Sequence, residues 1–302
     1  MADRRVLIAV GGGYGNIVMA TPAIAAARSM ADVADVLVES HLPDAATLLA
    51  GWDVVDAVHL HRRSLRPSGC LYSAVVRARW SNGAPFHLAP EFVPDDVPPD
   101  AIHEAELNLT AVRRLGYEGP LPAPHVETET PLRSLPRRFI AVAPGHGGVK
   151  RSDWRRKAWP HWRAFCRRCR EELGLDIVIL GAERDRRRWM DTEDRLGLHN
   201  LCGCTSIRGA AGVIARSVQL IAIDNGLAHI GAALGRPTVV LFGATSEIKN
   251  RPLGADVRLV TADVDCRPCQ MTPRWDVCND WRCMREIAPD DVLAAMMSEA
   301  AA

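Results

Sequence analysis

Short apolar runs alternate with longer amphipathic stretches over the first 115 residues, which is the pattern of strands separated by helices. Strands that are buried on both faces of a parallel sheet are encoded by such short apolar runs. Residues 62–98 carry no pattern that predicts an element. The predicted strands are Arg5–Val10, Val33–Glu39 and Val54–Leu60, and the predicted helices are Ile17–Met30, Leu42–Ala50 and Ala101–Leu115.

The same alternation starts again after a proline-rich segment. Gly119–Pro136 contains five prolines, few apolar residues and no period, and this predicts a linker between domains. Beyond it, the predicted strands are Phe139–Ala143, Ile177–Leu180, Leu220–Ile223 and Val239–Phe242, and the predicted helices are Pro160–Leu173, Arg184–Leu196, Ser206–Arg216 and Leu227–Leu234. We therefore expect an α/β protein of two Rossmann-like domains, 1–136 and 137–302, that face each other across a cleft.

The composition is that of an ordinary globular protein. Of the 302 residues, 48% are hydrophobic and 24% are charged. The net charge of +1 gives no reason to expect a nucleic-acid partner. The sequence has no run of about eighteen apolar residues, so at most peripheral membrane contact is expected. The run Val6–Val10 is short and leads into glycines, which indicates a buried strand rather than a signal peptide and predicts a cytoplasmic protein.

The first candidate ligand site follows the predicted strand Leu220–Ile223, where Asp224-Asn225-Gly226-Leu227-Ala228-His229 opens a helix. The N–H groups and positive dipole end of a first helical turn favour a diphosphate. Gly226 permits close backbone approach, and His229 can donate to a phosphate. The alternative is structural: Asp224 or Asn225 caps the helix, and His229 is a hydrogen-bonded core histidine. The position at the carboxyl end of a strand favours ligand binding.

Two glycine-containing turns are weaker candidates. Pro144-Gly145 follows the strand Phe139–Ala143 and precedes the basic segment Lys150–Lys157. Such a turn suits a phosphate, although a plain exposed loop has the same composition. Gly11–Gly15 follows the first strand and permits close ligand contact. It does not match the dinucleotide fingerprint, because Asn16 stands where that pattern requires glycine.

Nine cysteines cannot all pair within one chain, and in a reducing compartment they are expected to be thiols or metal ligands. Four of them share one segment, without predicted secondary structure, that is rich in proline, aspartate and tryptophan: Cys266, Cys269, Cys278 and Cys283. Four thiolates suit a structural zinc or iron ion. The second pair lacks the C-x2-C spacing, so free structural thiols are an equal alternative to a metal or disulfide role. The other five are expected to pack in the interior: Cys70, Cys166, Cys169, Cys202 and Cys204.

Taken in order, these motifs resemble glycosyltransferase family 9, the lipopolysaccharide heptosyltransferases. The resemblance runs over nearly the whole chain, and the ordered set is more specific than any single motif. In the first half, Gly15–Ala23 is similar to the family's Gly-Asp-x4-Thr-Pro-Ala motif, and Ala101–Gly116 is similar to the helix that ends its first domain. In the second half the similar segments are Lys157–Pro160, Asp224–Pro237 and Leu241–Thr245.

The resemblance implies a GT-B fold and an inverting transfer from a nucleotide diphospho-sugar, usually ADP-heptose, with no cofactor required for transfer. It implies that Lys157 contacts the donor and takes part in catalysis, and that Asp224 binds the donor sugar. The donor-binding residues it indicates are Gly15, Pro144, Gly145, Lys157, Asp224, Asn225, Gly226 and His229. The acceptor is open between a lipopolysaccharide core, a protein and a small metabolite. A lipopolysaccharide acceptor would place the protein at the inner face of the inner membrane.

One position departs from the family pattern. The family aspartate that acts as the general base is Asn16 here, and an amide has no site that is basic enough to take a proton. Three explanations are open. The acceptor needs no such base, or another residue such as His41 or His103 supplies it, or the chain binds the donor without turning it over.

Two further classes fit the architecture less well. A dinucleotide-dependent oxidoreductase needs an acidic residue at the end of its second strand, for which Glu39 is the candidate. Epimerisation of a nucleotide sugar also suits two Rossmann-like domains and needs no acceptor. The fold does not separate these reactions, because function depends on the site.

Overall fold

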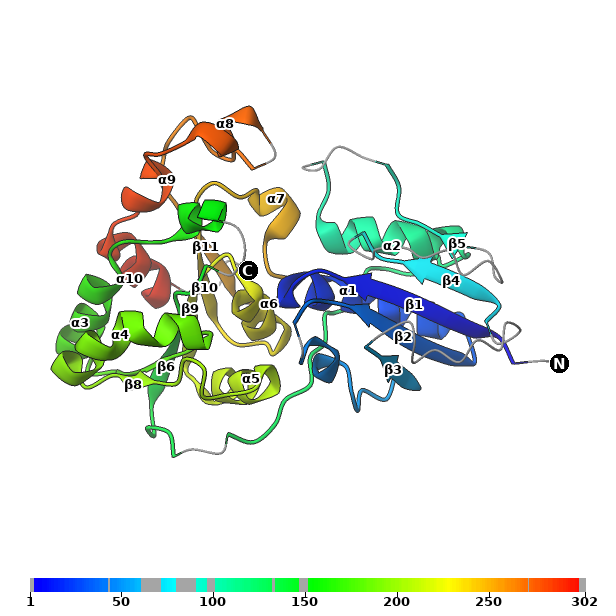
Figure 1. Ribbon diagram of the computed structural model, residues 1–302, viewed down its shortest axis with the longest axis horizontal. Helices are drawn as coiled ribbons and strands as arrows, with labels where there is room; N and C mark the ends of the chain where they lie inside the picture. The colour runs from blue at the N-terminus through cyan, green and yellow to red at the C-terminus, as the bar shows by residue number, and fades with distance from the viewer. Residues whose placement is uncertain are drawn as a thin grey trace. The chain divides into compact units, whose positions relative to one another are not determined.

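The structure is a computed structural model of the chain. It describes residues 3–42, 44–60, 72–79, 91–96, 101–131, 134–146, 152–270 and 272–298, excepting the side chains of 152–154 and 190–195. The chain divides into two compact units, Met1–Glu127 and Thr128–Ala302 (Figure 1). The division falls inside Gly119–Pro136, the proline-rich segment that the sequence predicts as a linker.

The first unit is built on a parallel sheet with the strand order β3-β2-β1-β4-β5. Its helices α1 and α2 pack against each other. The strands are β1 (Arg5–Gly11), β2 (Val33–Glu39), β3 (Ala57–His59), β4 (Ala74–Arg77) and β5 (Glu91–Phe92), and the helices are α1 (Tyr14–Ser29) and α2 (Glu104–Arg114). The predicted strands Arg5–Val10 and Val33–Glu39 are therefore confirmed, and the predicted strand Val54–Leu60 forms only over Ala57–His59.

The predicted helix Leu42–Ala50 is wrong. Only a 3-10 turn, Ala45–Leu48, forms there, and Leu49 N–H donates to the Ala46 carbonyl three residues back. Its buried residues, Ala45 and Leu48, are three positions apart and lie on the same side of the 3-10 turn. Gly51, whose φ is +97°, then turns the chain, because such a backbone conformation is rare for other residues.

The first strand shows why apolar runs predict this sheet so well. Val6, Ile8 and Val10 pack into one hydrophobic cluster with α1, while Leu7 and Ala9 pack into a second cluster on the opposite face. Every one of these side chains is at most 2% exposed. A strand that is covered on both faces has no polar position to interrupt its apolar run.

The second unit is a parallel sheet with the order β11-β10-β9-β6-β7-β8, which is the strand order of a doubly wound dinucleotide-type fold. Its strands are β6 (Phe139–Ala143), β7 (Asp176–Ile179), β8 (His199–Asn200), β9 (Gln219–Ile223), β10 (Thr238–Phe242) and β11 (Val257–Thr261). Figure 1 shows α3, α4 and α10 along one face of this sheet and α5 and α6 on the other. The helices are α3 (Trp162–Leu173), α4 (Glu183–Leu196), α5 (Ile207–Arg216), α6 (Gly226–Ala233), α7 (Glu247–Asn250), α8 (Pro273–Val277), α9 (Arg282–Arg285) and α10 (Pro289–Met297).

The cysteine-rich segment was expected to lack secondary structure, and this is wrong. It contains α8, which begins after Thr272 with Pro273 in its first turn, and α9. These helices have five and four residues. Elements of about one turn are too short to leave a detectable hydrophobic period.

Three cysteines pack in the core as expected. Cys166, Cys169 and Cys202 are each 0% exposed. Burial raises the pKa of Cys166, and it raises the pKa of Cys169 and of Cys202 to about 12, so these thiols stay protonated at neutral pH. Cys204 is only half-buried and lies beside the Arg186 guanidinium, which corrects the expectation of interior packing. Cys70 lies outside the described residues.

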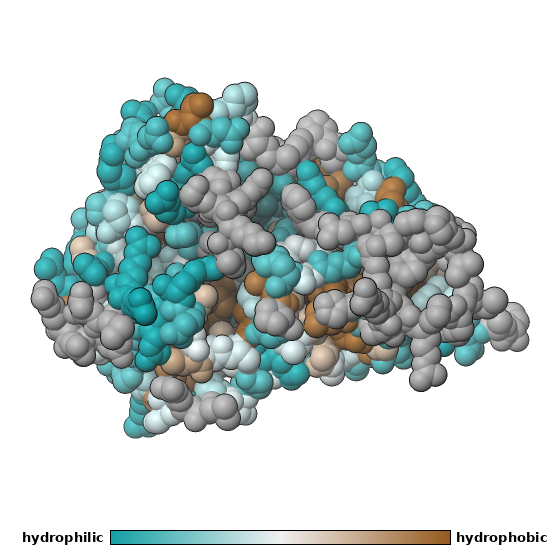
Figure 2. Space-filling view, viewed as in Figure 1, coloured by the Kyte–Doolittle hydropathy of each residue, from teal (hydrophilic) through white to brown (hydrophobic). Residues whose placement is uncertain are grey.

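The visible surface over α3 and α4 is mainly hydrophilic in Figure 2. Large hydrophobic side chains with substantial exposure in the described ranges are Val93, Val218, Ile248, Val277 and Met297. In those same ranges, no helix has the length and apolar character needed to cross a membrane.

Candidate functional site at the switch point of the second unit

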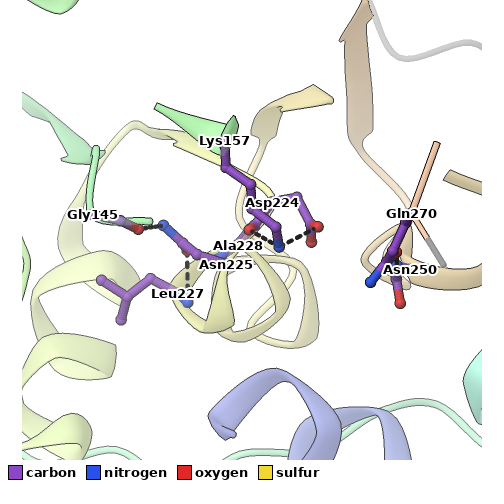
Figure 3. A network of polar contacts seen from close by, with 8 residues as sticks. All are labelled: Gly145, Lys157, Asp224, Asn225, Leu227, Ala228, Asn250 and Gln270. Atoms are coloured by element: carbon purple, nitrogen blue, oxygen red, sulfur yellow. Dashed lines mark hydrogen bonds and ion pairs between the residues drawn. The ribbon is translucent and has the colours of Figure 1, made fainter. Parts of the chain in front are cut away.

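Strands β6 and β9 lie side by side where the strand order of the second unit reverses. In doubly wound sheets, the carboxyl ends of such a strand pair bound the ligand crevice. Here they lead into Pro144-Gly145 and into Asp224-Asn225, so the structure brings two of the sequence-predicted segments together. Asn225 joins them directly, because its Nδ2 donates to the carbonyls of Ala143 and Gly145, each at 2.9 Å. Figure 3 shows the bond to Gly145.

Asn225 is also the N-cap of α6. Its Oδ1 accepts hydrogen bonds from Leu227 N–H at 3.0 Å and Ala228 N–H at 3.1 Å. Both ends of the amide are therefore engaged by the protein, and the capping interpretation is confirmed for this residue. Two of the first-turn N–H groups are satisfied by Asn225 rather than left for an anion. Gly226 is the first residue of the helix.

Lys157 and Asp224 form a buried ion pair beside this cap. Lys157 ends the 3-10 helix Ser152–Lys157, and its Nζ lies 2.7 Å from Asp224 Oδ2 and 3.0 Å from the Asp224 carbonyl oxygen (Figure 3). The side chains are 11% and 7% exposed, respectively. The structure thus places the two residues that the family resemblance singles out in direct contact.

Burial alone would raise the pKa of the Asp224 carboxyl, but the positive charge of Lys157 and the neighbouring His229 outweigh it and hold the pKa below its usual range. His229, in α6, is 4% exposed, and Thr245 is 1% exposed after β10. An ionised carboxylate can only accept hydrogen bonds, so Asp224 suits the hydroxyl groups of a sugar.

A cavity of about 230 Å³ is lined by Pro144 and Gly145, and by Ala158, the residue that follows Lys157. A Cβ at Gly145 would lie 2.8 Å from Asp185 Oδ2, so a side chain there would displace the Asp185 carboxylate. Trp162 also lines the cavity, and its buried Nε1 has no hydrogen-bond acceptor within the described part of the chain. Sequence reasoning missed Asp185 and Trp162. The available signal for Asp185 was its place in the first turn of the helix that follows β7.

The four cysteines of the C-terminal segment line a second cavity of about 250 Å³, namely Cys266, Cys269, Cys278 and Cys283. Burial and the neighbouring thiols raise the pKa of Cys283 to about 11 and also raise the pKa of Cys269. Arg156 closes one side, stacking over Trp275 at 5.4 Å and donating to the Cys278 carbonyl. Across the described ranges, no three His, Cys, Asp or Glu side chains are grouped to hold a metal ion, so the predicted metal site is not assembled in this arrangement.

In the first unit, Gly15 and Asn16 belong to the first turn of α1. Asn16 Oδ1 accepts from Gly13 N–H at 3.0 Å, and Asn16 Nδ2 donates to Glu104 Oε1 at 2.7 Å. Gly12 has a φ of +89°, and a Cβ there would lie 2.7 Å from Asn16 Oδ1. Sequence reasoning missed Glu104, which gives no local signal because polar residues are common at helix starts.

The two histidines that the sequence offers as alternative bases, His103 and His41, belong to different segments of the first unit. His103 caps α2, and its Nδ1 accepts from Ala105 N–H at 3.1 Å. His41 is exposed in the turn after β2. Residues 147–151, which include Lys150 of the predicted basic loop, lie outside the described residues.

Comparisons with known proteins agree with this architecture. The profile of glycosyltransferase family 9 (heptosyltransferase) matches residues 103–275. Lipopolysaccharide heptosyltransferase 2 of Escherichia coli K12 is 30% identical over 136 residues, which are 42% of this chain and 37% of that protein. The chain thus matches little more than a third of the length of this curated relative.

Two solved structures share the fold over most of the chain. E. coli ADP-heptose lipopolysaccharide heptosyltransferase II superposes with a TM-score of 0.72 at 18% identity, covering 98% of this chain and 100% of that one. The iron-containing dodecameric glycosyltransferase TibC of enterotoxigenic E. coli superposes with a TM-score of 0.69 at 13% identity, covering 97% and 77%.

Two parallel α/β units, with an acidic residue and a capped helix at the switch point of the second, define a protein with the GT-B fold of sugar transferases. The family profile covers more than half of the sequence, and the chain belongs to glycosyltransferase family 9.

Proposed function

We propose that this protein is an inverting glycosyltransferase that moves heptose from ADP-heptose to an acceptor hydroxyl. The buried Lys157–Asp224 pair at the switch point of the second unit carries the proposal. An ammonium and a carboxylate held 2.7 Å apart beside a helix N-terminus offer both a positive group for a diphosphate and an acceptor for sugar hydroxyls. Family membership and the fold likeness to a heptosyltransferase support the same activity.

The chemistry is a single displacement. The acceptor oxygen bonds to the anomeric carbon as the bond from that carbon to the diphosphate oxygen breaks, and the electron pair leaves with ADP. Lys157 and the first turn of α6, including Gly226 and His229, offset the charge that develops on the diphosphate, so transfer needs no divalent metal. Asp224 orients the sugar, and Asn225 holds the Gly145 turn against α6. The cavity of about 230 Å³ beside Gly145 suits one part of the nucleotide rather than the whole donor.

The acceptor is proposed to be a lipopolysaccharide core, on the strength of the relatives' names. A protein or a small metabolite is the alternative acceptor class. The protein would then work in the cytoplasm, where nucleotide sugars are used, and at the inner face of the inner membrane through peripheral contact.

A second candidate is a nucleotide-sugar-binding protein without turnover, and Asn16 at the position of the family aspartate favours it. Both candidates bind the donor, but only the transferase releases ADP from it. Nucleotides of other types, GDP or UDP sugars, are the alternative donors for the same site.

Thermal stabilisation by ADP, ADP-heptose, GDP, UDP and NAD tests the donor. A ligand that binds only the folded protein stabilises it by RT ln(1 + L/Kd), where L is the free ligand concentration, or about 2.7 kcal/mol at one hundred times Kd. We expect the largest shift with ADP-heptose, and we expect Asp224→Asn to reduce it. A shift with GDP or UDP alone would mean that the donor is a GDP or UDP sugar. A shift with NAD alone would contradict the transferase.

We further propose that the four-cysteine cavity takes a structural zinc or iron ion. Four thiols suit either metal, and TibC is an iron-containing relative in fold. Because the sulfur atoms are not grouped for an ion in this structure, binding would draw α8 and α9 together. Elemental analysis of the purified protein should find about one metal ion per chain, and a Cys266→Ser, Cys269→Ser double variant should lose it. Metal-free wild-type protein would overturn this proposal and leave the transferase intact.

A further inference from the structure

The first unit contains a carboxylate–amide pair that the proposed reaction does not yet use. Asn16 in α1 and Glu104, the first residue of α2, lie 88 residues apart in the chain, yet Asn16 Nδ2 donates to Glu104 Oε1 at 2.7 Å. Asn16 Oδ1 accepts from Gly13 N–H at 3.0 Å. These two bonds fix which end of the amide faces the carboxylate.

The pair occupies the ligand-binding edge of the first sheet. Strands β1 and β4 are neighbours where the order β3-β2-β1-β4-β5 reverses. Asn16 follows the carboxyl end of β1, and α2 is joined to the end of β4 by Asn108, whose Oδ1 accepts from Arg79 N–H at 3.0 Å. Crevices at such reversals are where doubly wound sheets bind ligands.

Glu104 is an unusual residue to bury. It is 1% exposed, and glutamate is almost never fully buried without a partner. Asn16 is the more exposed member of the pair, being half-buried. Asn108, also 1% exposed, donates from Nδ2 to the Met19 carbonyl at 3.4 Å and so ties α2 to α1. The Glu104 carboxylate therefore lies close to the place where Asn108 ties α2 to α1.

His103 and Asn16 are poorer proton acceptors than the Glu104 carboxylate. His103 Nδ1 already accepts the Ala105 N–H, so the ring proton is on Nε2 and that nitrogen is a donor. His41 is exposed after β2. Asn16 itself has no basic atom. Glu104 is the carboxylate that directly contacts the residue at the position where a base is expected.

We propose that Glu104 is the general base of the reaction and that Asn16 holds its carboxylate in position. The inference rests on the proposed transfer. As the acceptor oxygen bonds to the anomeric carbon and the electron pair of the breaking bond leaves with ADP, the acceptor's hydroxyl proton passes to a Glu104 carboxylate oxygen. Catalytic hydrogen bonds commonly form only in the substrate complex, so the burial of Glu104 in the free protein does not conflict with this role.

The test is a set of variants that removes the carboxylate from position 104 or transfers it to position 16, on the other side of the hydrogen bond. Glu104→Gln keeps an oxygen that accepts from Asn16 but removes the proton acceptor. The double variant Asn16→Asp, Glu104→Gln returns a carboxylate to position 16 with an amide opposite. Glu106→Gln is the matched control, because Glu106 lies on the same helix and is 38% exposed beside Arg113. Turnover is measured as ADP release from ADP-heptose, with heptose-free lipopolysaccharide or water as the acceptor.

We expect Glu104→Gln to lower kcat by about 100-fold to 10,000-fold, the usual range for a general base, while the thermal shift with ADP-heptose stays at the wild-type value. We expect kcat of the double variant to be at least about tenfold higher than that of Glu104→Gln. We expect kcat of Glu106→Gln to stay within about twofold of wild type. If Glu104 only holds Asn16 through their hydrogen bond, Glu104→Gln should keep most of kcat, because the glutamine Oε1 still accepts from Asn16. The acid limb of the pH–kcat profile should disappear in Glu104→Gln.

Near wild-type kcat in a folded Glu104→Gln protein would overturn the inference and leave the proposed transferase standing. If Glu104→Gln fails to fold, Asn16→Asp alone decides the question. Two carboxylates in contact share a proton, so the acid limb of the pH–kcat profile should move to higher pH in this variant. An unmoved acid limb would overturn the assignment of Glu104 as the general base. Wild-type protein that binds ADP-heptose and never releases ADP would overturn both the base and the transferase.

Discussion

Lys157 Nζ contacts Asp224 twice, at the carboxylate oxygen Oδ2 at 2.7 Å and at the carbonyl oxygen at 3.0 Å, although the residues are 67 positions apart. The loop before α3 is thereby joined to the end of β9. Since both side chains are about nine-tenths buried, the contact matters for the fold as well as for the donor.

Lys157→Met should therefore lower the free energy of unfolding by about 3 kcal/mol or more, because it leaves the Asp224 carboxylate buried without its ammonium. Urea denaturation measures this value. The control is Arg285→Ala, which breaks a pair of similar length, 2.8 Å to Asp280, whose side chains are 55% exposed. That variant should lose less than about 1 kcal/mol. Equal losses in the two variants would mean that burial does not govern the Lys157 pair.

The pH dependence of stability should follow the lowered pKa of Asp224. A carboxyl whose pKa is lower in the folded than in the unfolded state adds stability above its unfolded pKa, about 3.9, and that stability is lost as the pH falls through the folded pKa. The difference in Tm between wild type and Asp224→Asn should be constant from about pH 8 to pH 5 and shrink below about pH 4. A difference that shrinks between pH 7 and 6 would show that the carboxyl titrates near neutrality.

Asn225→Ala should destabilise the protein more than loss of an ordinary helix cap. The substitution removes two hydrogen bonds that the side chain accepts from N–H groups of α6 and two that it donates to the Ala143 and Gly145 carbonyls. We therefore expect the free energy of unfolding to fall by about 2 kcal/mol. Ser206→Ala removes the cap of α5, where the hydroxyl accepts from Gly209 N–H, and should cost about 1 kcal/mol. Chemical denaturation of both variants gives the comparison, and a smaller loss for Asn225→Ala would contradict the bridging role.

Gly12 and Gly51 form a matched pair for testing the Asn16 turn. Both have positive φ, +89° and +97°, so alanine is strained at either position. At Gly51 nothing lies within 4 Å of the added Cβ, whereas at Gly12 the Asn16 side chain lies 2.7 Å away. Gly12→Ala should displace Asn16 and lower turnover at least tenfold, while Gly51→Ala should lose only about 1 kcal/mol of stability and keep its turnover. Equal turnover in the two variants would remove the positional role of Asn16.

The cysteines should differ in their reaction with iodoacetamide at pH 8. Cys266 and Cys278 are half-buried, whereas Cys283 is 5% exposed with its pKa raised to about 11. The thiolate is the reactive form, so Cys266 and Cys278 should react before Cys283, and the core residue Cys169 should react only on unfolding. Peptide mass spectrometry reports the order. Prior addition of zinc should protect Cys266 and Cys278 if the cavity binds it, and reaction of Cys283 as fast as Cys278 would contradict the assigned burial.

Much of the fold was predictable from the sequence because its strands are covered on both faces. The predicted strand Phe139–Ala143 has the bounds of β6, and Val33–Glu39 has the bounds of β2. Where elements are only a turn long, as in α8 and α9, too few residues repeat for a pattern to appear. Ala45–Leu48 shows the converse, an amphipathic stretch that forms only a 3-10 turn.

The sequence by itself determined the two α/β alternations, the break between them and the ordered motifs of a sugar transferase family, since each depends on residues that are neighbours in the chain. Only the tertiary structure decided that Lys157 meets Asp224, that the Asn225 amide donates to the Gly145 carbonyl, and that Asn16 faces a buried carboxylate on Glu104. These contacts join residues from 67 to 88 positions apart. Their distances follow from the order of strands in each sheet, which no local pattern of hydrophobic and polar residues encodes.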